Sequence, residues 1–236
     1  MFSETFDKRP FGIIFDAVGT LIDPAPPVAE AYAAAAARQG VVLDRGVVKE
    51  RFHRFFRNDE MDEPRGPLQT DEPSERRRWQ RIVGNVLPEV PDPVRAFGEL
   101  WDHFGRSAAW RCFPDVGPVL ETLRRRGIPV RVASNFDARL RSVVAGLDEL
   151  RGLADCLVIS SEVAYRKPHP AFFQAVCASI GLPPDRLLSV GDDERNDVLG
   201  AEAAGLRGLW LDRSGRKAGA LPRITALEEL EAHLPG

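Results

Sequence analysis

Cysteine is scarce in this chain of 236 residues, which contains 3 cysteines in all. The odd number and wide spacing of Cys112, Cys156 and Cys177 argue against a disulfide or zinc framework and suit buried thiols in a reducing compartment. No apolar run approaches the ~20 residues that a membrane-spanning helix needs, and the first ten residues lack the apolar core of a signal peptide. We therefore expect a soluble cytoplasmic protein with no membrane partner.

Net charge is also small, and lysine is rare among the basic residues. The formal charge of -3 gives no electrostatic reason to expect nucleic acid as a partner. Arginine is the default cation, because only 4 of the 32 basic residues are lysines. The apolar fraction of 44% fits a packed protein, and the length allows one large domain or a core with a smaller insert. The oligomeric state stays open.

Apolar strands alternate with amphipathic helices along most of the chain. We expect strands over residues 11–15, 129–133, 156–160, 187–190 and 208–212. Helices are expected over 115–127, with Asp115 as the N-cap, over 170–181, and in a segment that ends at Gly205. Near-continuous apolar strands are covered on both faces, which predicts an α/β fold with a doubly wound, mostly parallel sheet.

The segment from residue 24 to 108 has a different character, because no convincing strand occurs in it. We expect four helices there, over residues 27–39, 44–57, 74–87 and 93–107, and a Pro/Gly-rich acidic loop over 58–73. An all-α cap domain over 24–108 is therefore predicted to interrupt a core domain formed by 1–23 and 109–236.

Two of the expected strands end in an aspartate. Asp16 follows the strand FGIIF, and Asp192 follows LLSVG. Because the carboxyl ends of parallel strands meet at one edge of the sheet, the two carboxylates are expected to share a site. Carboxylate oxygens are ligands that Mg²⁺ prefers. Asp193 competes for this role, but its place after the strand end favours Asp192.

Four short motifs resemble, in order, those of the haloacid dehalogenase (HAD) superfamily. They are Asp16–Thr20 (DAVGT), Ser134–Asn135, Lys167–Pro168, and Gly191–Asp192 with Asp197. The resemblance covers essentially the whole chain, and the helical insert looks like the helical-cap class. It implies a Rossmann-like core and a hydrolase, which in the phosphatase members acts on phosphorylated small molecules with Mg²⁺.

The resemblance assigns chemical roles to the motif residues. Asp16 would be the nucleophile that forms an aspartyl-phosphate, which splits a hard displacement into two easier steps. Lys167 would place a compact positive charge beside the phosphate and this carboxylate. Asp197 would orient Lys167 or a metal-bound water. Taken singly, each of these residues also has an ordinary explanation as a turn, cap or solvated loop residue.

Substrate and metal ligands come from the same motifs. The Ser134 hydroxyl and the N–H of Asn135 are expected to hold phosphoryl oxygens, and Thr20 is expected to bond the Asp16 loop. Asp16, Asp192 and the backbone carbonyl of Val18 are the expected ligands of Mg²⁺.

Val18 departs from the phosphatase pattern, in which an aspartate two residues after the nucleophile protonates the leaving oxygen and then activates water. This general acid–base contribution is typically ~10²–10⁴ in rate, and valine cannot supply it. A phosphohydrolase with Val18 would use leaving groups that need no proton, such as acyl or aryl phosphates. Otherwise it would take an acid from the cap, where His53, His103 and the acids of 58–73 are candidates.

Three other interpretations remain open. A 2-haloacid dehalogenase expels halide without a proton, but that family resembles this chain less at the last motif and needs no metal. A phosphonate hydrolase needs a cap lysine, and Lys49 lies in a charged helix. A catalytically weak HAD-fold binding protein would have no evident need to retain Asp16, Lys167 and Asp192 together.

Clustered arginines in the expected cap also have two interpretations. Arg76–Arg78, beside Trp79 and Arg81, either line the substrate side of the cap or form a solvated helix end, and base rates for charged runs favour the solvated end. Arg124–Arg126 are expected to be solvated.

Overall fold

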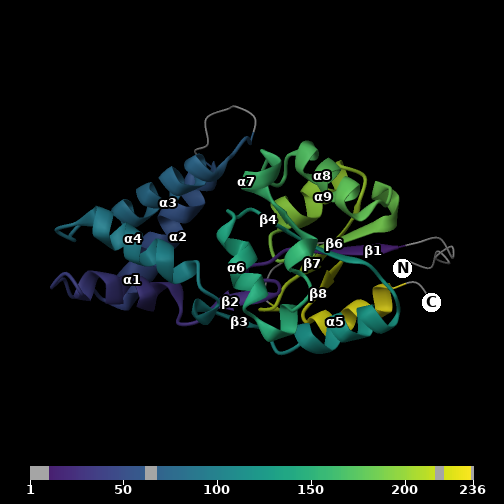
Figure 1. Cartoon of the computed structure of the whole chain (residues 1–236), viewed down its shortest axis with the longest axis horizontal. Coiled ribbons are helices and arrows are strands. Elements are labelled where there is room, and N and C mark those ends of the chain that lie inside the picture. The colour runs from purple at the N-terminus through teal and green to yellow at the C-terminus, as the bar shows by residue number, and fades with distance from the viewer. Residues whose placement is uncertain (1–10, 62–67, 216–220, 235–236) are drawn as a thin grey trace.

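A six-stranded, all-parallel sheet lies at the centre of the computed structural model, which describes residues 11–61, 68–215 and 221–234 (Figure 1). The strand order is β5-β4-β1-β6-β7-β8. The strands are β1 (Gly12–Phe15), β4 (Val130–Ser134), β5 (Leu157–Ile159), β6 (Leu187–Gly191), β7 (Arg207–Leu211) and β8 (Arg223–Ile224). The predicted α/β class with a parallel sheet is confirmed. The sequence analysis missed β8.

Strand β1 occupies the position that matters for the site. It pairs with β4 on one side and with β6 on the other, so the chain order reverses beside it. All four of its residues are buried, because successive side chains enter different cores. Ile13 belongs to one apolar cluster and Ile14 to another. The crevice at such a reversal, outside the carboxyl ends of the strands, is where open α/β sheets bind ligands.

Helices cover both faces of the sheet. They are α5 (Val116–Arg125), α6 (Arg139–Ala145), α7 (Ser160–Val163), α8 (Pro170–Ile180), a six-residue π-helix (Glu194–Leu199) and α9 (Gly200–Ala203). Asp115 was expected to cap α5, and this is wrong. Its carboxylate accepts no bond from the helix and instead pairs with Arg213, 98 residues away, and with the N–H of Leu227.

Four helices lie between the two short strands of an antiparallel ribbon, β2 (Ile22–Pro24) and β3 (Trp110–Cys112). They are α1 (Val28–Ala37), α2 (Arg45–Met61), α3 (Glu72–Val86) and α4 (Pro93–Phe104), and all four were expected. Their buried apolar side chains form a cluster separate from those of the sheet. On this ground we propose the division into a core of 1–23 and 109–236 and a cap of 24–108.

The expected loop over 58–73 is shorter than predicted. Helix α2 continues to Met61 and α3 already begins at Glu72, while residues 62–67 lie outside the described part of the chain. Asp71 accepts a bond from the N–H of Ser74 and so starts α3. Among the described residues, no helix has both the length and the apolar character to cross a membrane.

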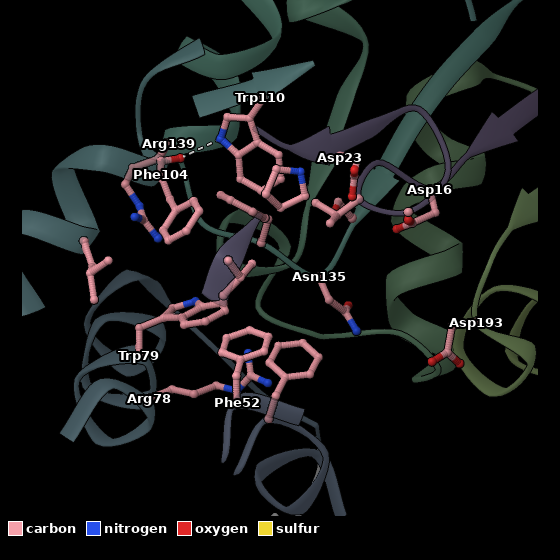
Figure 2. Close-up of a pocket in the computed structure, with 18 of the residues that line it drawn as sticks. Asp16, Asp23, Phe52, Arg78, Trp79, Phe104, Trp110, Asn135, Arg139 and Asp193 are labelled. Atoms are coloured by element: carbon pink, nitrogen blue, oxygen red, sulfur yellow. Dashed lines mark hydrogen bonds between the residues drawn. The ribbon is translucent and has the colours of Figure 1, made fainter. Parts of the chain in front are cut away.

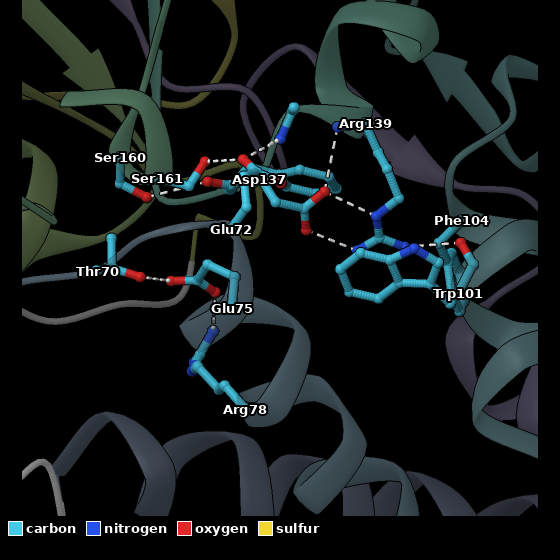
Figure 3. A network of polar contacts seen from close by, with 12 residues as sticks. Thr70, Glu72, Glu75, Arg78, Trp101, Phe104, Asp137, Arg139, Ser160 and Ser161 are labelled. Carbon is cyan, nitrogen blue, oxygen red and sulfur yellow. Dashed lines mark hydrogen bonds and ion pairs between the residues drawn. The ribbon is translucent and has the colours of Figure 1, made fainter. Parts of the chain in front are cut away.

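Cap and core also contact each other through polar side chains (Figure 3). The Glu72 carboxylate, in the first turn of α3, accepts bonds from the Ser161 hydroxyl and from the N–H of Ala138. On the other side, Arg139 of α6 donates to the carbonyl of Trp101 in α4 at 2.7 Å. These contacts place the helices of the cap over the carboxyl edge of the sheet.

Candidate functional site

A cavity of about 360 Å³ lies between the carboxyl ends of the strands and helices α1–α4. Figure 2 shows Asp16 and Asn135 on one side of it and Trp79 on the other. Seven of the eight residues expected at the site line this cavity, namely Asp16, Val18, Ser134, Asn135, Lys167, Asp192 and Asp197. The structure therefore gathers residues that are up to 181 positions apart in the chain, since 197 minus 16 is 181.

Lys167 is the residue around which the polar part of the cavity is organised. Its ammonium donates to Asp16 Oδ1 at 2.7 Å, to Asp197 Oδ1 at 2.6 Å and to the carbonyl of Ala133 at 2.9 Å. An ammonium has three N–H donors, and these contacts use all three. The two carboxylates and the carbonyl raise the pKa of Lys167, which stays charged despite its burial.

The two carboxylates beside Lys167 lie in a dry environment. Burial raises the pKa of Asp16, the Lys167 ammonium opposes this, and the charge of Asp192 raises the pKa further. Burial likewise raises the pKa of Asp197, against the attraction of Lys167. Asp197 is held from both sides, because its Oδ2 accepts the N–H of Asp193 at 3.0 Å. We infer that repulsion between these acids is incompletely offset by one lysine.

The acidic cluster fits a hard cation. Carboxylate oxygens of Asp16, Asp192 and Asp197 all lie within 4.8 Å of one another. Gly19 permits the close approach of Asp192, since its φ is +90° and a Cβ there would stand 2.6 Å from an Asp192 oxygen. An all-oxygen donor set of this size suits Mg²⁺, and Val18, whose carbonyl is the other expected ligand, lies in the same loop.

Asn135 has a second task that the sequence did not reveal. Its side-chain oxygen accepts the N–H of Lys167 at 2.7 Å, and its Nδ2 donates to the Lys167 carbonyl at 3.0 Å. The amide therefore clamps the backbone that carries Lys167, which leaves its own backbone N–H as the group expected to meet a phosphoryl oxygen. Ser134, at the end of β4, is buried and lines the cavity.

Thr20 is the one expected site residue that does not line the cavity. Its side chain is fully buried, and its hydroxyl has no hydrogen-bond partner among the described residues. Its backbone carbonyl accepts a bond from Arg213 at 2.7 Å. This places Thr20 behind the Asp16 loop, on the side away from the cavity.

The acid that Val18 lacks has different candidates from those expected. His53 and His103 do not line the cavity, and the masked part of 58–73 lies outside the described residues. Two other acids line it, Asp23 of β2 and Asp193. Asp23 pairs with Arg111 at 3.0 Å, and Asp193 accepts the N–H of Asn196.

The clustered arginines separate into different environments. Arg78 is buried and lines the cavity, where its guanidinium lies over the rings of Phe56 and Trp79 at 5.3 and 5.5 Å. Arg76 lies over Trp101 on the exposed side. The interpretation of a solvated helix end is therefore wrong for Arg78, which packing of α3 against α2 turns inward. A helical spacing alone could not show this.

Comparison with known proteins gives a consistent family. A model of haloacid dehalogenase-like hydrolases matches residues 12–205. The mouse (Mus musculus) haloacid dehalogenase-like hydrolase domain-containing protein 3 is 30% identical, over 94% of this chain and 96% of its own. The phosphoglycolate phosphatase of Escherichia coli is 28% identical, over 85% of this chain and 80% of its own.

Solved structures share the fold over nearly the whole chain. A defluorinating L-2-haloacid dehalogenase superposes with a TM-score of 0.74 at 18% identity, covering 97% of this chain and 96% of its own. A HAD phosphatase from Thermococcus onnurineus superposes with a TM-score of 0.63 at 21% identity, covering 96% and 98%. At these identities the likeness shows the fold alone.

Proposed function

The chain belongs to the haloacid dehalogenase-like hydrolase family, and from this premise we propose that it is a Mg²⁺-dependent phosphatase of small phosphorylated molecules. One observation carries the proposal. The Asp16 carboxylate is held 2.7 Å from Lys167 and shares a cluster within 4.8 Å with Asp192 and Asp197. A nucleophile, a fixed cation and a hard-metal donor set thus occupy one cavity. The phosphoglycolate phosphatase among the relatives supports the same chemistry.

The reaction would proceed by two displacements at phosphorus. In the first, an Asp16 oxygen attacks, the bond from phosphorus to the leaving oxygen breaks, and the leaving group departs with the electron pair. In the second, water attacks phosphorus and releases phosphate and the Asp16 carboxylate. Lys167 holds Asp16 in place and supplies a positive charge, while Asp197 holds Lys167.

Mg²⁺ would be held by Asp16, Asp192 and the carbonyl of Val18. When bound, it supplies positive charge that offsets the acidic cluster and the phosphoryl oxygens. The Ser134 hydroxyl and the N–H of Asn135 would bind the remaining phosphoryl oxygens, as donors at the end of β4.

Val18 restricts the leaving group. With no acid at this position, the first displacement depends on how readily the leaving oxygen departs as an anion. Acyl and aryl phosphates meet this condition, and alkyl phosphates do not. The missing base also slows the attack of water in the second displacement.

A dehalogenase is the second candidate, and Val18 is the observation that favours it, because halide leaves without a proton. Against it stands the carboxylate of Asp192, which halide displacement does not require. A turnover panel with and without Mg²⁺ decides between them, using 4-nitrophenyl phosphate, acetyl phosphate, a sugar phosphate and 2-chloropropionate. We expect Mg²⁺-dependent turnover of the first two compounds. Metal-independent turnover of 2-chloropropionate alone would overturn the phosphatase.

A further inference from the structure

Seven aromatic rings form a continuous belt along the cavity. In spatial order they are Trp79, Phe56, Phe52, Tyr32, Phe104, Trp110 and Phe136, and all seven line the cavity. Neighbouring ring centroids lie 5.9, 5.5, 5.6, 6.4, 5.9 and 6.1 Å apart along this series. These separations are within the range in which aromatic rings attract one another.

The belt begins in the cap and ends at the reacting centre. Trp79 lies on α3, and Phe136 directly follows Ser134 and Asn135, which are expected to hold the phosphoryl group. Figure 2 shows Trp79, Phe104 and Trp110 on the side of the cavity that faces Asp16. A molecule whose phosphoryl group lies at Asp16 would therefore place the rest of its body against the rings.

Part of the belt is packed for stability, and part of it is open. Tyr32 is 1% exposed and Trp110 is 8% exposed, so these rings serve mainly as a wall. Phe52, Phe56 and Trp79 are only partly buried while lining the cavity, which leaves their surfaces open to a ligand. The Arg78 guanidinium over Phe56 and Trp79 holds these two rings in place.

Val18 restricts the substrate independently of the belt. Without an acid, the substrate needs a leaving oxygen of low basicity, and a phenolic oxygen meets this need better than an alkoxide. The belt selects for a planar ring, and Val18 selects for a leaving group that a ring provides. We propose that the substrate class is the aryl phosphates, monoesters of a phenol whose ring packs against Phe52, Phe56 and Trp79. This inference rests on the proposed phosphatase activity.

Binding of non-hydrolysable ligands tests the ring site apart from catalysis. Calorimetry in Mg²⁺ would compare phenylphosphonate, cyclohexylphosphonate and methylphosphonate on the full chain. We expect phenylphosphonate to bind about tenfold more tightly than methylphosphonate, which corresponds to ~1.4 kcal/mol, and more tightly than cyclohexylphosphonate. Equal affinity of the phenyl and methyl compounds would overturn the ring site.

Variants on one helix provide a matched comparison. Phe52→Leu and Phe56→Leu remove belt rings, whereas Phe55→Leu removes a ring of the same helix that does not line the cavity. We expect the first two to lose most of the preference for the phenyl compound and Phe55→Leu to keep it. If a belt variant fails to fold, the ligand comparison on the unaltered chain still decides. An equal loss in all three variants would contradict the belt.

Kinetics separates failure of this inference from failure of the proposed function. Acetyl phosphate and 4-nitrophenyl phosphate both leave without a proton, but only the second has a ring. We expect kcat/KM to be at least tenfold higher for 4-nitrophenyl phosphate. Equal values would leave a phosphatase without ring selection. No turnover of either compound, with no phosphonate bound, would overturn both proposals.

Discussion

The ammonium of Lys167 lies 2.7 Å from the carboxylate of Asp16, although 151 residues separate them in the chain. Both side chains are nearly buried, with 4% and 11% of their surfaces exposed. A charged pair in such a position is costly to disrupt, because the group that remains is a buried charge without compensation. This contact therefore links the stability of the protein to the geometry of its proposed nucleophile.

Removal of the Lys167 charge should destabilise the fold. Lys167→Met leaves Asp16 and Asp197 facing each other without a cation, and breaking a buried pair in this way typically costs ~3–5 kcal/mol. Chemical unfolding would measure the difference. Lys49→Met, which replaces an exposed lysine of α2, is the control and should change little. Equal unfolding free energies for the two variants would show that the buried contact contributes nothing.

Asp192 should control the affinity for Mg²⁺. Asp192→Asn keeps the size of the side chain but removes its charge from the cluster with Asp16, so we expect a loss of at least ~10-fold in affinity. Calorimetry with the metal alone measures this without turnover. Asp193→Asn is the matched control at the next position. An unchanged dissociation constant in Asp192→Asn would place the metal elsewhere.

Acid should weaken a contact between two cap helices. Hydrogen bonds from Arg38 and Arg95 hold the pKa of Glu99 below its ordinary value of 4.5. A depressed carboxyl pKa stabilises the fold above about pH 4.5, and this stabilisation is lost as the pH falls. Glu99→Gln should therefore lower the unfolding free energy at pH 7, by about 0.5 kcal/mol for such solvent-screened pairs.

At pH 3 the same variant should match the unaltered chain, because Glu99 is then largely protonated in both states. Urea unfolding at the two pH values checks this. A difference that is equal at both values would assign the effect of Glu99→Gln to packing instead of charge.

The sequence predicts the sheet and the gathering of acids well, for a physical reason. Strands buried on both faces are continuous apolar runs, and parallel strands bring their carboxyl ends to one edge. Phe15 and Val190 are indeed paired, so the aspartates that follow β1 and β6 meet. The catalytic and metal-binding roles assigned to these aspartates remain predictions.

Features that depend on packing between distant segments could not be predicted. The clamp of Asn135 on Lys167 joins positions 32 apart, and Asp115 is drawn from its expected cap by Arg213. The aromatic belt arises from the angles at which α1–α4 pack, and helical spacing alone makes Phe52 and Phe55 equivalent. Only the structure shows which of the two lines the cavity.

Val18 should make turnover depend steeply on the leaving group. Aryl and acyl phosphates should react measurably, and alkyl phosphates hardly at all. Val18→Asp should raise alkyl phosphate turnover by up to ~10²–10⁴, the usual contribution of general acid–base catalysis. The control Val18→Asn has the same size but carries no acid, and should give no gain. If the unaltered enzyme hydrolyses alkyl and aryl phosphates equally, another acid donates, and Asp23 and Asp193 are the first to replace.

Trapping of a phosphorylated Asp16 tests the central claim most directly. Because Val18 cannot activate water, the aspartyl-phosphate should break down slowly and accumulate when the enzyme is mixed with acetyl phosphate and Mg²⁺. Mass spectrometry after acid quenching should show one added phosphoryl group, on the peptide that contains Asp16. The added mass should disappear in Asp16→Asn and decrease in Val18→Asp. A phosphoryl group that persists in Asp16→Asn, or turnover of acetyl phosphate by that variant, would contradict the account.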